Sequence, residues 1–346
     1  MLAARMYGIN DLRVEEVPTP TPGPGEVLVK VEAAAICGTD VRILTAGSPI
    51  VDAGQPLILG HEFAGIVHTL GDGVTAYVPG DRVAVAPNMG CGHCDLCVAG
   101  NGQLCPDYRA LGVNLDGGFA EYALIPAGAV RGGNLTPLGE SSFVEGALNE
   151  PFSCALNGFE RCAVQPGDLV LIVGAGAIGL MHAKLAKLAG ASRVVLSDLS
   201  EERQAAARAI DGSFVTVGAL DAAQAAALTG SHLFDVIVTA CPSPAAQQAS
   251  LAQAAVNGRI CLFGGLPKGR EEVALNTNVI HYKQLIVSGT TRASLAQYRK
   301  TLRFIREKVL SMEDLVTRRA PLAQIGELFE LAKQAKGLKN LVVGDG

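Results

Sequence analysis

The sequence of 346 residues contains no tryptophan, and aromatic residues make up only 5% of it. It also has no excess of basic residues, since 28 Lys and Arg stand against 33 Asp and Glu for a net charge of −5. The basic residues are scattered along the chain, whereas proteins that bind nucleic acid gather them into a patch. We therefore expect no nucleic-acid partner.

Long hydrophobic runs are absent as well. The longest, residues 169–181, is shorter than the roughly 20 residues that span a bilayer, so we expect no membrane contact. The first seven residues lead directly into Gly8, Asn10 and Asp11 and do not resemble a secretory signal. These features predict a cytoplasmic protein, in which nine cysteines are more readily metal ligands or buried thiols than disulfides.

The length suits two domains of ordinary size. Up to about residue 150, short apolar runs such as residues 63–67 and 82–85 are broken by Gly and Pro, which is typical of compact β structure. Beyond it, apolar strands alternate with Ala-rich helices and predict an α/β domain with a parallel sheet. The strand candidates are residues 169–173, 193–197, 236–240, 259–263 and 285–288. A helix is expected over 297–309, and residues 339–343 permit a last strand that returns to the first domain.

A glycine-rich turn follows the first of these strands and opens a helix. Gly174 permits the tight turn, Gly176 lets the backbone approach a pyrophosphate, and Gly179 lets helix and strand pack closely. A glycine-rich turn without a ligand is the alternative. Asp198 opposes it, because it ends the next strand at the spacing expected of a carboxylate that binds the adenosine ribose.

Asp198 also bears on which dinucleotide is bound. A carboxylate there would repel a 2′-phosphate, so we expect NAD rather than NADP. Ile178, inside the glycine-rich turn, and Arg203 complete the candidate cofactor-binding residues. Arg203 is either an adenine or ribose neighbour or a solvated helix residue.

Four cysteines, Cys91, Cys94, Cys97 and Cys105, follow the spacing C-x2-C-x2-C-x7-C in a lobe at about residues 88–108. Four thiolates fill a tetrahedral shell and leave no open position, so the metal expected here is a structural zinc. An iron–sulfur cluster and four unconnected thiols are the alternatives.

A second group of zinc-ligand types comprises Cys37, His61 and Glu150. Each alone would be a buried thiol, a core histidine or a surface charge, but together they suit a catalytic zinc, which needs three protein ligands and one open position. Glu62 is a further candidate for the third ligand. Because neighbouring side chains in a strand face opposite ways, a regular strand through His61 and Glu62 would favour Glu150.

Several motifs in order resemble the zinc-containing medium-chain alcohol dehydrogenases, and within them the sorbitol and iditol (polyol) dehydrogenases. They are CGTD at 37–40, GHEFAG at 60–65, the four-cysteine lobe, GGFAEY at 117–122, EPFSCALNG at 150–158 and VGAGAIG at 173–179. The resemblance implies a GroES-like β catalytic domain made of residues 1–150 and 291–346. It also implies a Rossmann domain, with a doubly wound parallel sheet that binds NAD, at residues 151–290.

The resemblance further implies roles for single residues. Cys37 and His61 would bind the catalytic zinc together with Glu62 or Glu150, and Asp40 would orient His61. Thr39 would relay the proton of the substrate hydroxyl. Arg292 matches an arginine that lies near the nicotinamide in the sorbitol enzymes.

The activity implied is hydride transfer between an alcohol or polyol and NAD, with two zinc ions per chain, one catalytic and one structural. A homodimer or homotetramer is expected, with residues 262–266 and 285–290 as contact edges. A sugar-alcohol phosphate or a threonine-like amino alcohol is the alternative substrate. A non-catalytic zinc-binding protein of the same fold is the alternative from another class.

Overall fold

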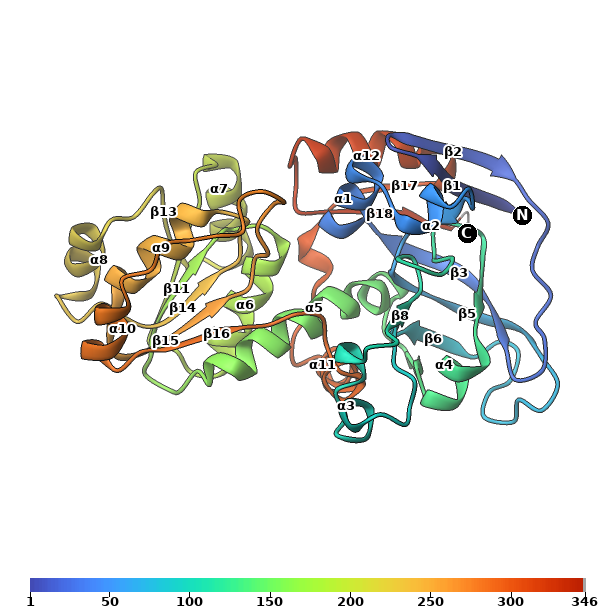
Figure 1. Cartoon of the computed structure of the whole chain (residues 1–346), viewed down its shortest axis with the longest axis horizontal. Coiled ribbons are helices and arrows are strands. Elements are labelled where there is room, and N and C mark those ends of the chain that lie inside the picture. The colour runs from blue at the N-terminus through green and yellow to red at the C-terminus, as the bar shows by residue number, and fades with distance from the viewer. Residues whose placement is uncertain (345–346) are drawn as a thin grey trace. The chain divides into compact units, whose positions relative to one another are not determined.

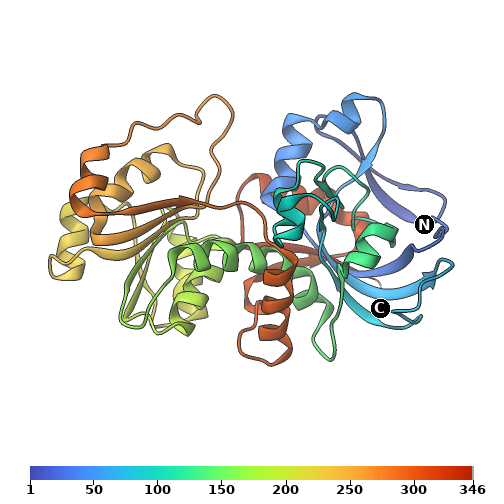
Figure 2. The same ribbon diagram turned by 60° about the horizontal axis from the view of Figure 1, so that its bottom comes forward.

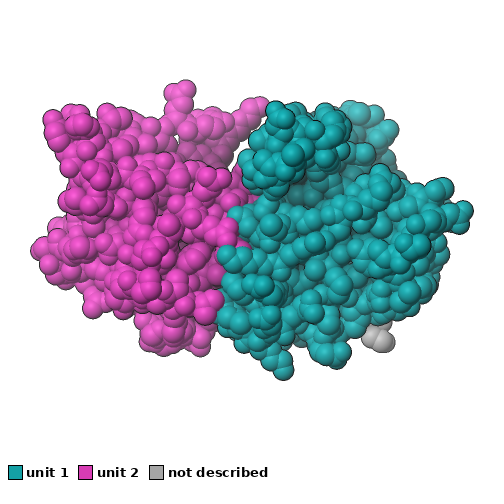
Figure 3. Space-filling model, turned by 90° about the horizontal axis from the view of Figure 1, so that it is seen from below, with its two compact units in different colours: residues 1–153, 293–346 teal, residues 154–292 magenta. Residues whose placement is uncertain are grey.

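The computed structural model describes residues 1–344, which form two compact units, coloured separately in Figure 3. Unit 1 comprises Met1–Ser153 and Ala293–Gly346, and unit 2 comprises Cys154–Arg292. The expected domain boundaries differ from these by a few residues, and Asp345 and Gly346 lie outside the described residues. No helix within residues 1–344 is both long and apolar enough to cross a membrane.

Unit 1 is built around a seven-stranded sheet that joins both ends of the chain (Figure 1). Its central strand, β3 (Val27–Ala35), pairs antiparallel with β5, β9 and β18. The other strands of this sheet are β5 (Glu62–Leu70), β6 (Arg82–Val85), β9 (Tyr122–Ile125), β10 (Leu135–Pro137), β17 (Val316–Ala320) and β18 (Lys339–Val343). The last strand of the chain thus returns to the first domain, beside the strand that leads to Cys37.

Two smaller sheets and several short helices complete unit 1. The three-stranded sheet consists of β1 (Leu2–Gly8), β2 (Asp11–Glu16) and β4 (Leu57–Ile58), and β7 (Asn88–Met89) pairs with β8 (Arg109–Ala110). The helices are α1 (Gly38–Ala46), α2 (Pro49–Asp52), α3 (Asp95–Val98), α4 (Ala127–Gly132), α11 (Leu295–Arg306) and α12 (Ile325–Lys333), with short 3-10 turns η1 (Gly102–Leu104), η2 (Glu313–Leu315) and η3 (Leu322–Gln324). A Ser294–Gln297 capping box starts α11 and satisfies backbone N–H groups at its first turn.

Helix α5 (Phe143–Cys162) is a 20-residue helix that was not predicted, because residues 1–150 were expected to form mostly β structure. It carries Glu150 and continues through Pro151, although proline removes a backbone donor from a helix interior. The boundary between the two units falls within it. The change near Glu150, from β-rich sequence to alternating strands and helices, therefore falls inside a helix and not in a linker.

The core of unit 1 contains the segment that carries the candidate metal ligands. Phe119 and Phe329 are fully buried and meet edge to face at 5.8 Å. Gly60 lies against Phe119, because a Cβ atom there would come within 2.7 Å of the Phe119 ring. The turn before His61 is thus packed on an aromatic core, which fixes its position.

Unit 2 has the parallel sheet that the sequence predicts, with strand order β13-β12-β11-β14-β15-β16. The strands are β11 (Leu169–Val173), β12 (Arg193–Ser197), β13 (Val215–Val217), β14 (Phe234–Thr239), β15 (Ala254–Leu262) and β16 (Ile286–Gly289), and the helices are α6 (Ala177–Leu188), α7 (Glu201–Ile210), α8 (Ala222–Thr229), α9 (Pro244–Gln253) and α10 (Thr277–Lys283). Helices cover both faces of the sheet (Figure 2), as in a doubly wound fold. The short strand β13 was missing from the sequence prediction, and β15 starts five residues earlier than expected.

Candidate metal and dinucleotide sites

Cys37, His61 and Glu62 come together in unit 1. Cys37 is the N-cap of α1, and His61 lies directly before Glu62, the first residue of β5. One ligand atom from each residue lies within 4.8 Å of those of the other two. A thiol, an imidazole and a carboxylate at this spacing fit a zinc site with three protein ligands.

The candidate third ligand that joins this group is Glu62. Gly60 has a φ of +91°, and β5 begins at Glu62, so His61 precedes the regular strand. Strand alternation, which would favour Glu150, therefore does not apply at this turn. Glu150 is buried on α5 but is not part of the metal-compatible group found among the described residues.

Asp40 ties the ligand segments together. Its Oδ2 accepts a hydrogen bond from the backbone N–H of Cys37 at 2.8 Å, and its Oδ1 accepts one from Gly60 at 3.2 Å. The same Oδ1 lies 3.2 Å from Nδ1 of His61, as expected of a carboxylate that orients a metal-binding imidazole.

The group has a strongly negative environment. Burial lowers the pKa of His61, but the charges of Asp40 and Cys37 outweigh it and raise that pKa well above its usual value. Buried negative charge of this kind favours a bound cation. The residues present therefore fit a zinc ion on geometric and on electrostatic grounds.

Lys339 is a member of this site that the sequence analysis did not single out. It begins the C-terminal strand β18, is only 5% exposed, and donates a hydrogen bond of 2.6 Å to Oε1 of Glu62 and a shorter one to Oε2. Burial lowers the pKa of Lys339, but Glu62 and Cys37 outweigh it and raise that pKa. A charged residue at the head of the apolar run Leu341–Val343 was the one signal in the sequence.

The other residues expected to act on substrate are less constrained by the structure. Thr39 lies half-buried in the first turn of α1, two residues after Cys37. Arg292 is exposed at the end of unit 2 with a φ of +55°, and its carbonyl accepts a hydrogen bond of 2.8 Å from Asn157. Their roles in catalysis remain predictions.

Cys91, Cys94, Cys97 and Cys105 form a second metal-compatible group. Their sulfur atoms all lie within 4.8 Å of one another, held by α3 and η1 and the short β7–β8 ladder. Backbone N–H groups of His93 and Cys94 lower the pKa of Cys91 to about 6, which favours the thiolate that binds metal. This arrangement fits a closed tetrahedral site.

The glycine-rich turn of unit 2 shows why each glycine is needed. Gly174 has a φ of +110°, a conformation that side chains disfavour. A Cβ atom at Gly179 would lie 1.8 Å from the carbonyl oxygen of Gly174, so only glycine lets α6 approach the turn. At Gly176 the nearest atom to such a Cβ is Nη1 of Arg203 at 3.7 Å, which leaves the backbone open to a ligand.

A cavity of about 520 Å³ adjoins this turn. Gly174, Gly176, Asp198 and Arg203 line it, together with small residues after β14 such as Cys241 and Ser243. Ile178 lies half-buried in the first turn of α6. The volume and the mixture of apolar walls with few polar groups suit part of a dinucleotide.

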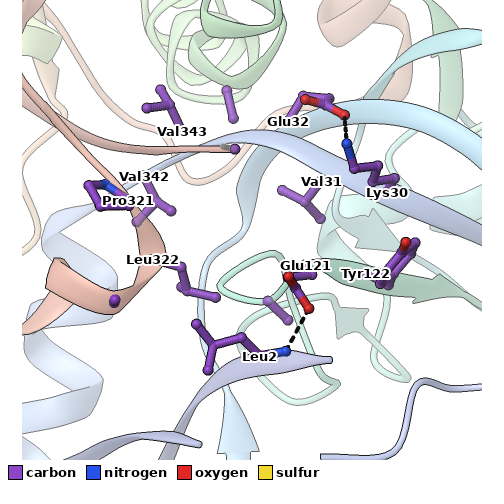
Figure 4. Close-up of a pocket in the computed structure, with 14 residues that line it drawn as sticks. Leu2, Lys30, Val31, Glu32, Glu121, Tyr122, Pro321, Leu322, Val342 and Val343 are labelled. Atoms are coloured by element: carbon purple, nitrogen blue, oxygen red, sulfur yellow. Dashed lines mark hydrogen bonds and ion pairs between the residues drawn. The ribbon is translucent and has the colours of Figure 1, made fainter. Parts of the chain in front are cut away.

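A smaller cavity of about 140 Å³ in unit 1 contains none of the candidate metal ligands (Figure 4). Its charged groups already have partners, since Lys30 pairs with Glu32 at 2.9 Å and Glu121 accepts a hydrogen bond from the backbone of Leu2. We assign no chemistry to it.

Two family models match the chain. The model of the alcohol dehydrogenase GroES-like domain matches residues 23–131, and that of the zinc-binding dehydrogenases matches residues 177–307. The sorbitol dehydrogenase of Bacillus subtilis (strain 168) is 33% identical over 97% of this chain and 94% of its own length. The L-threonine 3-dehydrogenase of Saccharopolyspora erythraea is 34% identical over 94% and 93% of the two chains.

A solved structure agrees with these relatives. The crystal structure of a zinc-binding dehydrogenase from Sinorhizobium meliloti 1021, bound to NADP, matches with a TM-score of 0.89 and 32% identity, covering 99% of this chain and 98% of that one. The fold expected from the sequence, a GroES-like domain with a Rossmann domain, is confirmed. With relatives this similar along nearly its whole length, the chain belongs to the zinc-containing medium-chain alcohol dehydrogenases, a family of NAD(P)-dependent oxidoreductases, and is similar within it to the sorbitol dehydrogenases.

Proposed function

We propose that this enzyme transfers a hydride between a polyol, or a related secondary alcohol, and NAD, with a catalytic zinc held by Cys37, His61 and Glu62. The observation that carries the proposal is the convergence of these three ligand atoms within 4.8 Å on a turn braced by Asp40. A zinc at this place supplies a Lewis acid that polarises the substrate hydroxyl.

The chain's own residues supply the remaining functions. Asp40 fixes the ring of His61 and the backbone of Cys37, so that the ligands need not reorganise during the reaction. Thr39, two residues from Cys37, receives the hydroxyl proton in this scheme. The backbone at Gly176 and the N-terminus of α6 bind the pyrophosphate, and Asp198 binds the adenosine ribose.

The second zinc belongs to Cys91, Cys94, Cys97 and Cys105 in our proposal, where it holds a lobe with little apolar core. Five candidate zinc-binding thiols in one chain would work best in a reducing compartment, and we propose the cytoplasm. Cell fractionation with detection of the tagged protein tests this location.

A homo-oligomer is also part of the proposal. Strand β16 is an edge of the parallel sheet, paired only with β15 among the described strands, and its residue Ile286 is 59% exposed. An open edge with an exposed apolar side chain favours pairing with a second copy. Sedimentation should show a dimer or tetramer that Ile286→Lys weakens, and a monomeric wild type would contradict this.

The zinc content and NAD reduction of the wild type and of Cys37→Ser test the enzymatic proposal. We expect two zincs per chain to fall to one, with loss of activity on sugar alcohols. L-Threonine and galactitol 1-phosphate belong in the same substrate panel. Turnover with either alone would replace the polyol assignment, and one zinc with no turnover in the wild type would contradict the catalytic site.

A further inference from the structure

The second half of helix α5 packs on strand β15 within unit 2, and two cysteines meet there. A Cβ atom at Gly158 would lie 2.8 Å from the ring of Phe263, which directly follows β15. One helical turn after Gly158, the side chains of Cys162 and Cys261 are hydrogen-bonded to each other. Positions 261 and 263 share one face of the strand, and positions 158 and 162 share one face of the helix. The two thiols thus belong to a close and regular contact between the helix and the strand.

Arg259 holds the same two elements together independently of the thiols. Its Nη1 donates a hydrogen bond of 2.6 Å to the carbonyl oxygen of Ala163, and its Nη2 donates one of 2.8 Å to Oδ2 of Asp168. Ala163 directly follows Cys162, and Arg259 precedes Cys261 by two residues on the same face of β15. The backbone beside each cysteine is therefore fixed by a contact that does not involve sulfur.

Both side chains are buried, but one of them lies close to the surface. Cys162 is 1% exposed and Cys261 is fully buried. Cys162 is also the last residue of α5, and its neighbours Arg161 and Ala163 are exposed. Helix ends open more readily than helix interiors, so fraying of a single turn would admit a molecule as small as hydrogen peroxide. Neither cysteine belongs to a metal-compatible group found within residues 1–344.

The hydrogen bond makes the two thiols chemically unequal. The bond to Cys261, together with burial, raises the pKa of Cys162. Donation from Cys162 outweighs burial at the other sulfur and lowers the pKa of Cys261, with a smaller contribution from the charge of Arg161. Because the thiolate is the nucleophile in thiol chemistry, Cys261 is the member of the pair that attacks first.

We propose that Cys162 and Cys261 form an oxidisable dithiol, which peroxide converts into a disulfide and thiol reductants restore. The Cys261 thiolate attacks one oxygen of hydrogen peroxide, the O–O bond breaks, hydroxide leaves, and Cys261 becomes a sulfenic acid. The Cys162 thiol then attacks that sulfur, and the sulfenic oxygen leaves as water with the thiol proton. Both sulfurs are oxidised and the peroxide is reduced. The proposal depends on neither zinc site.

Peptide mapping of the zinc-loaded full chain after treatment with hydrogen peroxide tests this directly. We expect a linked peptide that joins residues 162 and 261, loss of two free thiols per chain and an unchanged zinc content. Dithiothreitol should return both thiols. Oxidation of the zinc-binding cysteines, with zinc release, while Cys162 and Cys261 stay free would overturn the proposal. This measurement needs no variant.

Variants test the order of the two steps. In Cys162→Ala the sulfenic acid of Cys261 has no resolving thiol, so peroxide should make Cys261 reactive toward dimedone, whereas Cys261→Ala should leave Cys162 unlabelled. The matched control is Cys154→Ala, which removes a cysteine from the same helix and should form the linked peptide as the wild type does. Labelling of Cys162 in place of Cys261 would refute Cys261 as the attacking thiol.

The melting temperature shows whether the pair is placed to close without distorting unit 2. The disulfide would span a loop of about 100 residues, and closing a loop of that length restricts the unfolded chain strongly. Oxidised wild type should therefore melt about 5 °C or more above the reduced protein. Cys162→Ala treated in the same way should show no such rise. A lower melting temperature of the oxidised wild type would mean that the bond strains the helix–strand contact and would contradict the proposal.

Discussion

Asp198 accepts a hydrogen bond of 2.7 Å from the backbone N–H of Ala175, which joins the end of β12 to the glycine-rich turn. Its other oxygen, Oδ1, accepts a bond of 2.9 Å from Ser200 at the start of α7. The carboxylate is thereby fixed at the edge of the dinucleotide cavity, with Nη1 of Arg203 3.9 Å away. We therefore expect the carboxylate of Asp198, held beside an arginine, to decide the choice between NAD and NADP.

Asp198→Ala should shift the cofactor preference toward NADP. The change removes the charge that repels a 2′-phosphate, while Arg203 keeps a positive charge in the lining of the same cavity. We expect the ratio of kcat/KM for NAD to that for NADP to fall about a hundredfold or more, from the loss of roughly 3 kcal/mol of discrimination. Steady-state kinetics with both cofactors measures the ratio.

The control for this change is Glu202→Ala, which removes an exposed carboxylate four residues away on α7. It alters the net charge equally but leaves the turn intact, so the ratio should stay within about twofold. If Asp198→Ala behaves like Glu202→Ala, Asp198 does not select the cofactor.

Loss of a sulfur from the cysteine lobe should remove one zinc and destabilise the lobe. Cys97→Ser takes away one of the four proposed ligands, and Gly90 packs so tightly on the sulfur that a Cβ atom there would come within 2.3 Å. Without its metal the lobe keeps few buried apolar contacts, so it should become the first site of limited proteolysis.

Metal analysis and proteolysis followed by mass spectrometry measure both effects. Cys154→Ser, which changes a cysteine outside either metal-compatible group, should keep two zincs and the wild-type cleavage pattern. A Cys97→Ser protein with its full zinc content would show that the lobe does not bind the metal.

Much of this structure follows from local sequence signals. The strand at residues 169–173, the glycine-rich turn and Asp198 form one continuous unit, so their spacing along the chain fixes their arrangement in space. The four cysteines lie within fifteen residues and likewise specify a compact lobe. In both cases the residues that matter are close in sequence.

The contacts that the sequence did not reveal are long-range ones. Lys339 meets Glu62 across 277 residues, and no local pattern links them. The choice between Glu62 and Glu150 depends on the left-handed turn at Gly60, which packs against Phe119. Helix α5 contains Pro151, a residue that argues against a helix interior when it is read locally.

His182 should make the protein lose stability in acid. It is 1% exposed on α6, neither ring nitrogen has a hydrogen-bond partner within residues 1–344, and burial lowers its pKa from 6.5 to about 3. Because the unfolded chain binds a proton below pH 6.5 and the folded one does not, stability falls as pH drops from 6.5 toward 3. The slope from this group is about 1.4 kcal/mol per pH unit.

Urea unfolding of the wild type and of His182→Leu at pH 7.5, 6.5 and 5.5 measures this contribution. The free energy of unfolding of His182→Leu relative to that of the wild type should rise by about the predicted slope as the pH falls below 6.5. Loss of zinc is common to both proteins and cancels in this difference. His68→Leu, which removes an exposed histidine, is the matched control. A constant difference for His182→Leu would mean that its imidazole is protonated in the folded state.

Two substitutions that each add one methyl group to the glycine-rich turn should distinguish an effect on stability from an effect on cofactor binding. Gly179→Ala places a Cβ atom 1.8 Å from the Gly174 oxygen, so α6 must move away and the protein should lose about 1–3 kcal/mol of stability as well as NADH affinity. Gly176→Ala meets no atom closer than 3.7 Å and has a φ of −74°, which alanine adopts freely. It should therefore keep the wild-type melting temperature and lose NADH binding about tenfold or more, because the methyl group occupies the path of the pyrophosphate.

Gly212→Ala, at a glycine with no atom within 4 Å of the added methyl, should change neither quantity. Thermal melting and NADH fluorescence titration give the two readouts, and normal NADH binding by Gly176→Ala would show that the pyrophosphate does not lie against this turn.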